Sequence, residues 1–130
     1  MKKLILIILF LYMPLNAFED LKSLSQLKEH SLVFLVFEKH GCPWCTKYDI
    51  ELGSKIIDKY GKDIQFFKVE KGSEMFSQLR KEFGFKIIIY PMTYMIKLND
   101  KNVSEIIEEI YGYQTEEYVE ELILKTFLIK

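Results

Sequence analysis

Residues 31–60 join an apolar segment to a long amphipathic segment through a short turn and a C-x-x-C motif. The apolar segment, SLVFLVFE (residues 31–38), has the length and the Val and Phe content of a strand buried on both faces. In the amphipathic segment, large apolar residues recur every four positions, which predicts a helix over residues 43–60. The recurring residues are Trp44, Tyr48, Leu52, Ile56 and Tyr60. The chain therefore contains a strand–turn–helix unit with both of its cysteines at the junction.

The segments on either side of this unit predict further helices and a second strand. Leucines at three-residue intervals indicate a short amphipathic helix within residues 18–30. Residues 63–70 have the length and composition of a strand, and Ser73 then caps a helix that Gly84 ends. Because a helix connects the first two strands, we expect them to be parallel.

The last third of the chain predicts a hairpin followed by a helix. Residues 92–98 and 103–111 are strand-like, and the turn signal at residues 99–102 joins them as antiparallel neighbours. Thr115 caps the final helix, and three large apolar residues are expected on its inner face. These are Tyr118, Leu122 and Phe127. The predicted order α-β-α-β-α-β-β-α describes an α/β domain with a mixed four-stranded sheet and helices on both faces.

Composition limits the size and the partners of this domain. A chain of 130 residues with 49% hydrophobic and 15% aromatic residues is large enough for one packed core. The formal net charge of −1 gives no electrostatic basis for a nucleic-acid partner. We expect a monomer without a bound cofactor.

The first 17 residues have the anatomy of a secretory signal peptide. A basic start, Met1-Lys2-Lys3, precedes ten apolar residues and a helix-breaking Pro14, and the small Ala17 stands at a plausible cleavage point. The apolar run is shorter than the roughly 20 residues that span a bilayer. An uncleaved membrane anchor is the alternative, because Leu15 is bulky for its position before the cut. We therefore expect residues 1–17 to be a signal peptide and residues 18–130 to be an exported, periplasmic domain.

The motif Cys42-Pro43-Trp44-Cys45 admits several chemistries. The loop it closes is too small to constrain much of the unfolded chain, which weakens the case for a structural staple. A zinc site needs about four ligands, and the two histidines, His30 and His40, are poorly spaced to supply the other two. Covalent haem attachment requires a histidine where Thr46 stands. Reversible redox chemistry is favoured, with a static disulfide, or a carrier of metals or sulfur compounds, as the alternatives.

The order of the elements, with C-x-x-C between the first strand and its helix, resembles the thioredoxin fold over residues 18–130. Tyr90-Pro91-Met92-Thr93 places a proline before the third strand, where that family has a cis-proline opposite the disulfide. Gly112-Tyr113-Gln114-Thr115 is similar to the family's glycine after the last strand and its capped terminal helix. The segment FEKHGCPWC (residues 37–45) looks most like the exported thioredoxin-like proteins of bacteria.

The position of the motif predicts which cysteine attacks a substrate. A thiolate at a helix N-terminus is stabilised by unpaired backbone N–H groups and by the positive end of the helix dipole. Cys42 has that position, and Cys45 lies one turn further into the helix. We expect Cys42 to be the nucleophile and Cys45 to resolve the mixed disulfide.

Trp44, Tyr90 and Pro91 are the predicted substrate-binding residues. Trp44 lies at the helix tip, where it is either a platform for an apolar substrate or partly packed on the sheet edge. The resemblance implies that Pro91 is cis and that the backbone of Tyr90 is presented to an extended substrate. Tyr90 replaces the small β-branched residue that the family has before this proline.

Glu38 and Lys68 are a predicted proton relay for Cys45. Val36 stands where the family has its buried acid, and Glu38 follows on the same face of the strand. Lys68 occupies the position of the family's partner lysine on the neighbouring strand. The alternative is two strand-end charges that reach water.

The resemblance implies an exported thiol–disulfide oxidoreductase that acts on protein thiols and disulfides. A reductant in an oxidising compartment needs electrons from elsewhere, so a membrane thiol donor is the expected partner. The alternative is a redox-silent binding module whose disulfide is static.

Overall fold

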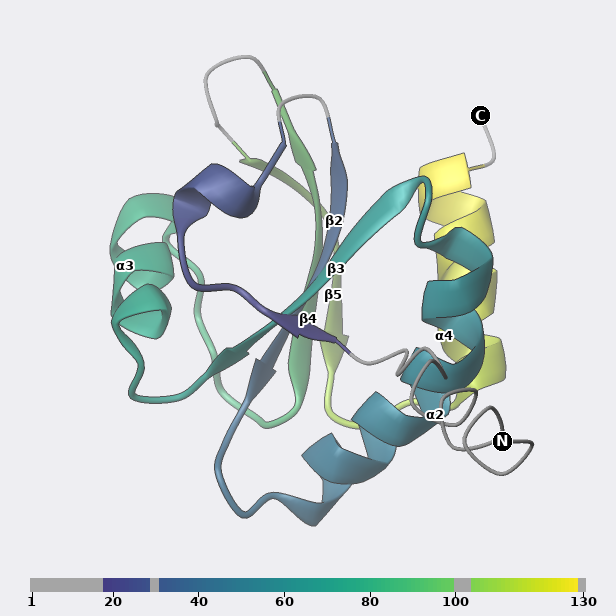
Figure 1. The fold of residues 1–130 in the computed structure, drawn as a ribbon, viewed down its shortest axis with the longest axis horizontal. Coiled ribbons are helices and arrows are strands. Elements are labelled where there is room, and N and C mark those ends of the chain that lie inside the picture. Colours follow the sequence, from purple (N-terminus) through teal and green to yellow (C-terminus); the bar gives the residue numbers. More distant parts are fainter. Residues whose placement is uncertain (1–17, 29–30, 100–103, 129–130) are drawn as a thin grey trace, which may run out of the picture.

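A computed structural model describes residues 18–28, 31–99 and 104–128 of the chain, which form one five-stranded sheet with helices on both faces (Figure 1). The strands are β1 (Glu19–Asp20), β2 (Leu32–Glu38), β3 (Ile64–Glu70), β4 (Met92–Leu98) and β5 (Ser104–Tyr111). The helical segments are the 3-10 turn η1 (Leu24–Gln26), α2 (Pro43–Tyr60), α3 (Glu74–Phe83), α4 (Glu116–Ile123) and the π-helical turn η2 (Leu124–Leu128).

The strand order is β1-β3-β2-β4-β5, with β2 at the centre. β1, β3 and β2 are parallel, whereas β4 runs antiparallel to both β2 and β5. The predicted mixed sheet and hairpin are therefore confirmed, but the prediction of four strands is wrong, because the short β1 adds a fifth at the edge beside β3.

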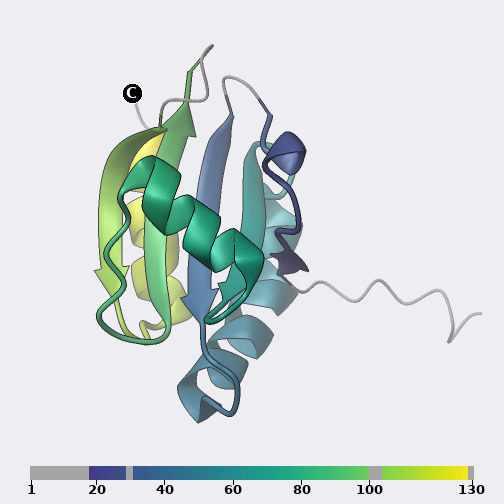
Figure 2. The same ribbon diagram turned by 90° about the vertical axis from the view of Figure 1, so that its left-hand side faces the viewer.

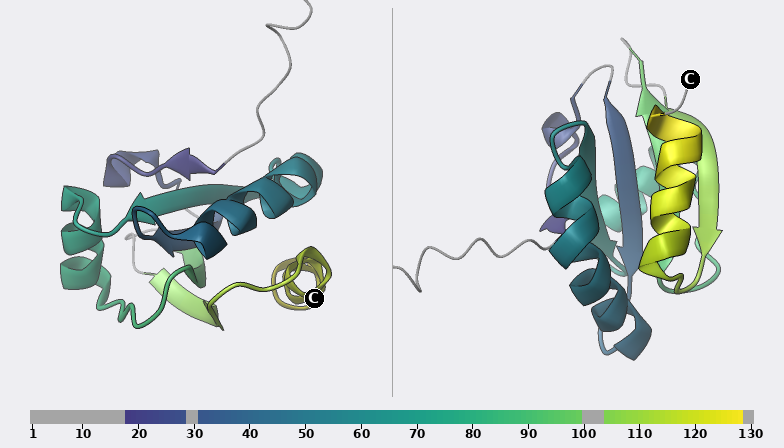
Figure 3. Two further views of the ribbon diagram at one scale, coloured as in Figure 1. Left: turned by 90° about the horizontal axis from the view of Figure 1, so that it is seen from below. Right: turned by 90° about the vertical axis from the view of Figure 1, so that its right-hand side faces the viewer.

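Helices cover the sheet unequally. α2 and α4 lie side by side on one face, and α3 lies on the other together with η1 (Figures 2 and 3). Side chains of β2 alternate between two apolar cores: Phe34 and Val36 pack under α2 and α4, whereas Val33, Leu35 and Phe37 pack under α3. All five are buried, which explains why the β2 sequence is continuously apolar.

The segment before β2 differs from the amphipathic helix expected within residues 18–30. β1 pairs with β3, and helical structure there is limited to the short turn η1. Ser23 and Gln26 form a capping box at η1, so these side chains bond to local backbone N–H groups that a longer helix would otherwise use. Leu21 and Leu27 are nevertheless buried against the α3 side of the sheet. Their spacing reflects burial rather than a helix.

Local signals set both ends of α3, as predicted. Ser73 caps α3 by accepting from the N–H of Phe76 (3.1 Å), and Gly84 ends it with a left-handed φ of 69°.

On α4 and η2, the buried face is shifted by one residue from the predicted face at two of three positions. Val119 and Ile123 are buried together with Phe127, whereas Tyr118 is exposed and Leu122 is only half-buried.

Residues 1–17, predicted to be a signal peptide or an anchor, lie outside the described residues. Within the described part of the chain, no helix is long and apolar enough to cross a membrane.

Candidate active site

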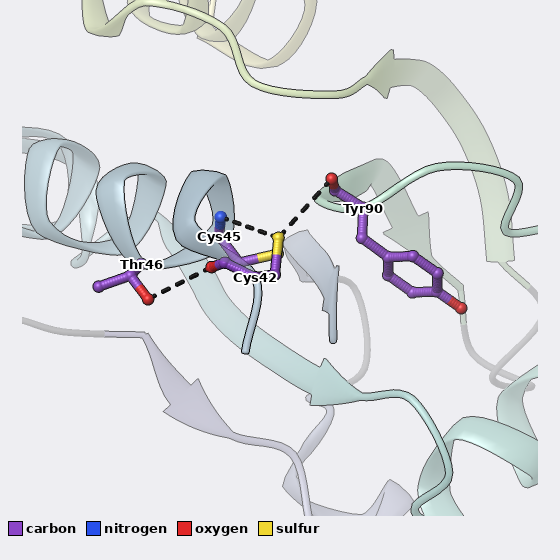
Figure 4. The surroundings of a disulfide bond; sticks show 4 residues. All are labelled: Cys42, Cys45, Thr46 and Tyr90. Atoms are coloured by element: carbon purple, nitrogen blue, oxygen red, sulfur yellow. Dashed lines mark hydrogen bonds between the residues drawn. A yellow bond between two sulfur atoms is a disulfide. The ribbon is translucent and has the colours of Figure 1, made fainter. Parts of the chain in front are cut away.

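The two cysteines lie at the first turn of α2, where they form a disulfide with Cα atoms 5.3 Å apart. Cys42 is the N-cap residue, and its Sγ accepts from the N–H of Cys45 at 3.2 Å (Figure 4). Pro43 follows at the first helical position, where a missing N–H costs nothing. The backbone therefore delivers a hydrogen-bond donor and the positive end of the helix dipole to Cys42 Sγ. Both stabilise negative charge on this sulfur.

The two sulfurs differ in their access to solvent. Cys42 is partly exposed, whereas Cys45 is buried, with 3% of its surface exposed. A substrate can therefore approach Cys42 but not Cys45.

Tyr90 and Pro91 lie opposite the disulfide, just before β4. The peptide bond between them is cis, as the resemblance implied. The carbonyl oxygen of Tyr90 lies 3.9 Å from Cys42 Sγ, while its ring points away from the disulfide (Figure 4). A sulfur in a disulfide has no proton to donate, so this contact becomes a hydrogen bond only when Cys42 is a thiol.

A pocket of about 310 Å³ opens on the other side of the disulfide. Its lining includes both cysteines, the exposed Lys39, His40 and Glu70 at its rim, and four charged side chains that come from four different elements. These are Asp20 of β1, Glu38 of β2, Asp49 of α2 and Lys68 of β3. Lys68 Nζ lies 3.4 Å from Asp49 Oδ2, and both side chains are mostly buried. The fold thus brings the predicted Glu38 and Lys68 into one pocket with Cys45.

Burial in this pocket changes the acidity of Glu38. Burial is the largest cause of a pKa that rises from 4.5 to about 8. Asp49 raises this pKa further through a hydrogen bond and its negative charge, whereas the positive charge of Lys68 lowers it. Burial lowers the pKa of Lys68, but the charges of Asp49, Glu38 and Asp20 outweigh it, so that this pKa is raised. At neutral pH, Glu38 is mostly protonated and Lys68 is charged.

Asp20 and Asp49 are pocket residues that the sequence reasoning missed, and a local signal existed only for Asp49. Asp49 follows Cys45 by four residues on α2, so the helical repeat places both on the same side of the helix. That spacing was the available signal.

Trp44 does not line the pocket and is 55% exposed. Its ring centroid lies 5.2 Å from that of Tyr113, in the loop after β5. Lys47 Nζ lies over both rings, 5.3 Å from the Trp44 centroid and 5.0 Å from that of Tyr113. The hydroxyl of Tyr113 donates to Glu51 of α2. Trp44 is thus both exposed and held in place on one side.

His40, one of the two possible zinc ligands, is almost fully exposed, and its Nδ1 lies 3.8 Å from Glu70. His30 lies outside the described residues. In the part of the chain that the structure covers, no three His, Cys, Asp or Glu side chains are grouped as metal ligands are.

Comparison with known proteins gives the fold a name. No protein-family model matches the sequence, and no curated protein is similar to it in sequence. Solved structures, however, match most of the chain. Thioredoxin from Malassezia sympodialis (Mala s 13) is 17% identical with a TM-score of 0.66, covering 88% of this chain and 94% of its own.

Two further structures agree. Thioredoxin from Nicotiana alata is 18% identical with a TM-score of 0.62, covering 88% of this chain and 96% of its own. An uncharacterized thioredoxin-like protein from Clostridium perfringens is 17% identical with a TM-score of 0.60, covering 88% of this chain and 86% of its own. The chain has the thioredoxin fold. At the first turn of α2 it carries a close cysteine pair, an arrangement that supports thiol–disulfide exchange in general.

Proposed function

We propose that this protein is a thiol–disulfide oxidoreductase that uses Cys42 and Cys45 as its dithiol. One observation carries the proposal: a partly exposed Cys42 sulfur caps α2 and accepts from a backbone N–H, while its partner Cys45 lies buried beneath it. Such a cap lowers the cost of a thiolate at the one sulfur that a substrate can reach.

The reaction runs through two exchanges. In the reduced protein, the Cys42 thiolate attacks one sulfur of a substrate disulfide, forming a mixed disulfide and releasing the other substrate sulfur as a thiolate. Cys45 then loses its proton and attacks Cys42 Sγ, which restores the Cys42–Cys45 disulfide and releases the second substrate thiolate. The substrate gains two electrons and two protons, and the protein loses them. Oxidation of a substrate dithiol is the same sequence reversed.

Glu38 is the proposed acceptor of the Cys45 proton. A general base works best when its pKa is near the working pH, and Glu38 meets this condition with a pKa of about 8. The pocket has room for water to carry the proton between the two groups. Asp49 and Lys68 form an ion pair beside Glu38; after burial, Asp49 raises the pKa of Glu38 further and Lys68 lowers it.

We propose further that the protein works outside the cytoplasm, with a membrane thiol protein as its electron donor and other proteins as its substrates. The support is the composition of residues 1–17, which is typical of a signal peptide. The glutaredoxin range of reduction potentials, about −200 to −230 mV, is the expectation for a motif with proline and an aromatic residue between the cysteines.

The test is a pair of cysteine variants. Cys45→Ser should trap mixed disulfides with a substrate protein, because Cys42 still attacks and nothing resolves the adduct. Cys42→Ser should trap none. Non-reducing gels and mass spectrometry of the adducts measure both results.

The unmutated protein in an insulin-reduction assay is the reference. If it shows no turnover with any thiol donor and its Cys42–Cys45 bond survives millimolar dithiothreitol, the disulfide is static. The proposal is then wrong, and a redox-silent binding module takes its place.

A further inference from the structure

Three cations gather around the side chain of Tyr90. Lys39 Nζ, just after β2, lies 5.9 Å from the centre of the Tyr90 ring, and Lys71 Nζ, just after β3, lies 5.7 Å from it. The third is Arg80 of α3: burial raises the pKa of the Tyr90 hydroxyl, and the positive charge of Arg80 partly offsets this rise. We call Lys39, Lys71 and Arg80 the Tyr90 cation cluster.

The cluster lacks internal counter-charges. Within the described residues, none of its three members has a carboxylate within the 4.0 Å that defines an ion pair. Other lysines do have such partners: Lys47, Lys55, Lys59 and Lys68 each pair with an acid. Glu70, which precedes Lys71 in the chain, lies 3.8 Å from His40 instead. The cluster is therefore free to bind an external anion.

Lys39 also lines the pocket beside the disulfide, whereas Lys71 and Arg80 do not. The Tyr90 carbonyl contacts Cys42, but the ring around which the cations gather points away from the disulfide (Figure 4). A polypeptide that brings its own disulfide to Cys42 passes along Tyr90, so its residues beside the cysteine come within reach of the cluster.

We propose that the Tyr90 cation cluster recognises carboxylates of an acidic peptide segment that flanks the substrate disulfide. This inference names the substrate class of the proposed oxidoreductase and rests on that function. The three cations come from three separate parts of the chain, after β2, after β3 and within α3, so several carboxylates along one segment fit them better than a single small anion. The whole chain has a net charge of −1, so the attraction is local to this cluster.

The experiment uses three disulfide-linked peptides that differ only in whether the residues flanking the cysteine are Glu, Gln or Lys. The reduced protein is mixed with each peptide, and the fluorescence of Trp44, the only tryptophan in the chain, follows its oxidation. The test variant is Lys39→Gln/Lys71→Gln/Arg80→Gln, with Lys39→Gln/Lys71→Gln as a second variant in case Arg80 is needed for folding. The control, Lys28→Gln/Lys62→Gln/Lys125→Gln, removes the same charge from exposed residues that lie outside the Tyr90 cation cluster.

We expect the unmutated protein to prefer the Glu peptide over the Lys peptide by roughly tenfold in kcat/KM, which is what three exposed charge contacts supply together. The preference should shrink as salt is added. Both test variants should lose most of the preference, and the control should keep it.

Three results overturn the inference, and they differ in what else they affect. Equal rates for all three peptides refute the acidic substrate but leave the oxidoreductase standing. The same assay is run with two small disulfides, the anionic glutathione disulfide and the cationic cystamine. If the protein prefers glutathione disulfide but shows no preference among the peptides, the substrate is a small anionic disulfide and not an acidic peptide. If no peptide oxidises the reduced protein, the proposed function falls as well.

Discussion

The two sides of the Cys42–Cys45 disulfide carry charge in different ways. On the pocket side, Glu38, Asp49 and Lys68 are partly or mostly buried and close to one another. Outside the pocket, on what we call the aromatic side, exposed lysines lie over aromatic rings, as Lys47 does over Trp44 and Tyr113. Charged side chains are therefore buried in one part of the site and exposed to water in the other.

Burial decides what each set of charges can do. In the pocket, desolvation and neighbouring charges raise the pKa of Glu38 into the range where a carboxyl exchanges protons near neutral pH. On the aromatic side, water and salt screen the exposed lysines, so they contribute a modest attraction for anions and weak cation–π contacts. We infer that the buried charges of the pocket handle protons, and that the exposed cations beside aromatic rings select the substrate.

The largest expected effect is on the rate at which the mixed disulfide is resolved, and it comes from a substitution in the pocket. Glu38→Gln removes the proton acceptor but keeps the shape of the side chain, so decay of the Cys42 mixed disulfide should slow by roughly tenfold to a hundredfold. Formation of that mixed disulfide should be unchanged, because Cys42 depends on the helix cap rather than on the pocket. Acid-quenched time points analysed by mass spectrometry measure the two steps separately.

Asp49→Asn sharpens the same prediction. In the unmutated protein, resolution should speed up with pH around a midpoint near 8, as Glu38 ionises. Asp49 raises the pKa of Glu38, so Asp49→Asn should move that midpoint to lower pH, whereas Glu38→Gln should abolish it. A midpoint that is identical in all three proteins would assign the titration to Cys45 itself and remove Glu38 from the mechanism.

The difference between the two sides also shows what the sequence could reveal. β2 follows from its continuous apolar run, α2 from its four-residue apolar repeat, and the hairpin from two strand-like segments joined by a turn signal. Cys42 as the cap of α2 follows from Pro43 and the helical repeat after it. Glu38 and Lys68 were found only through the resemblance to the thioredoxin family.

What the sequence did not reveal depends on contacts between distant segments. Asp20 reaches the pocket because β1 adds to the sheet edge, and leucine spacing alone does not separate that strand from a helix. The Tyr90 cation cluster joins the ends of β2 and β3 to α3, and no local pattern connects them. On α4, both Tyr118 and Val119 begin a four-residue apolar repeat, and packing against the sheet buries the second.

The second expected effect concerns the stability of the oxidised protein, in which the cysteines do not titrate. The pKa of Glu38 is about 8 in the folded state against an ordinary 4.5, so between these values the folded state binds more protons than the unfolded state. The free energy of unfolding should therefore fall as the pH rises from 4.5 to 8. One pKa unit corresponds to about 1.4 kcal/mol, and solvent in the open pocket reduces the total to the order of 1–2 kcal/mol.

Urea unfolding across this pH range, compared between the unmutated protein and Glu38→Gln, measures the effect. The variant should lack the fall and should be the more stable of the two above pH 8. Glu70→Gln, the same change in an exposed residue at the rim of the pocket, is the control and should keep the fall. Parallel curves for all three proteins would mean that Glu38 ionises normally in the folded state.

The smallest expected effect is on the aromatic side, where two tyrosines provide a matched pair. Tyr113 and Tyr111 both donate a hydroxyl hydrogen bond to a glutamate, but only Tyr113 lies against Trp44. Tyr113→Ala should cost on the order of 1–2 kcal/mol of unfolding free energy, because it removes the ring contacts with both Trp44 and Tyr48. Without the ring of Tyr113 beside it, Trp44 should emit fluorescence at longer wavelength. The KM for disulfide substrates should rise by roughly fivefold or less, and kcat should stay unchanged. Tyr111→Ala should change neither the emission nor the KM. If the two variants behave alike, Tyr113 does not hold Trp44 in place, and the aromatic side selects substrates through its lysines alone.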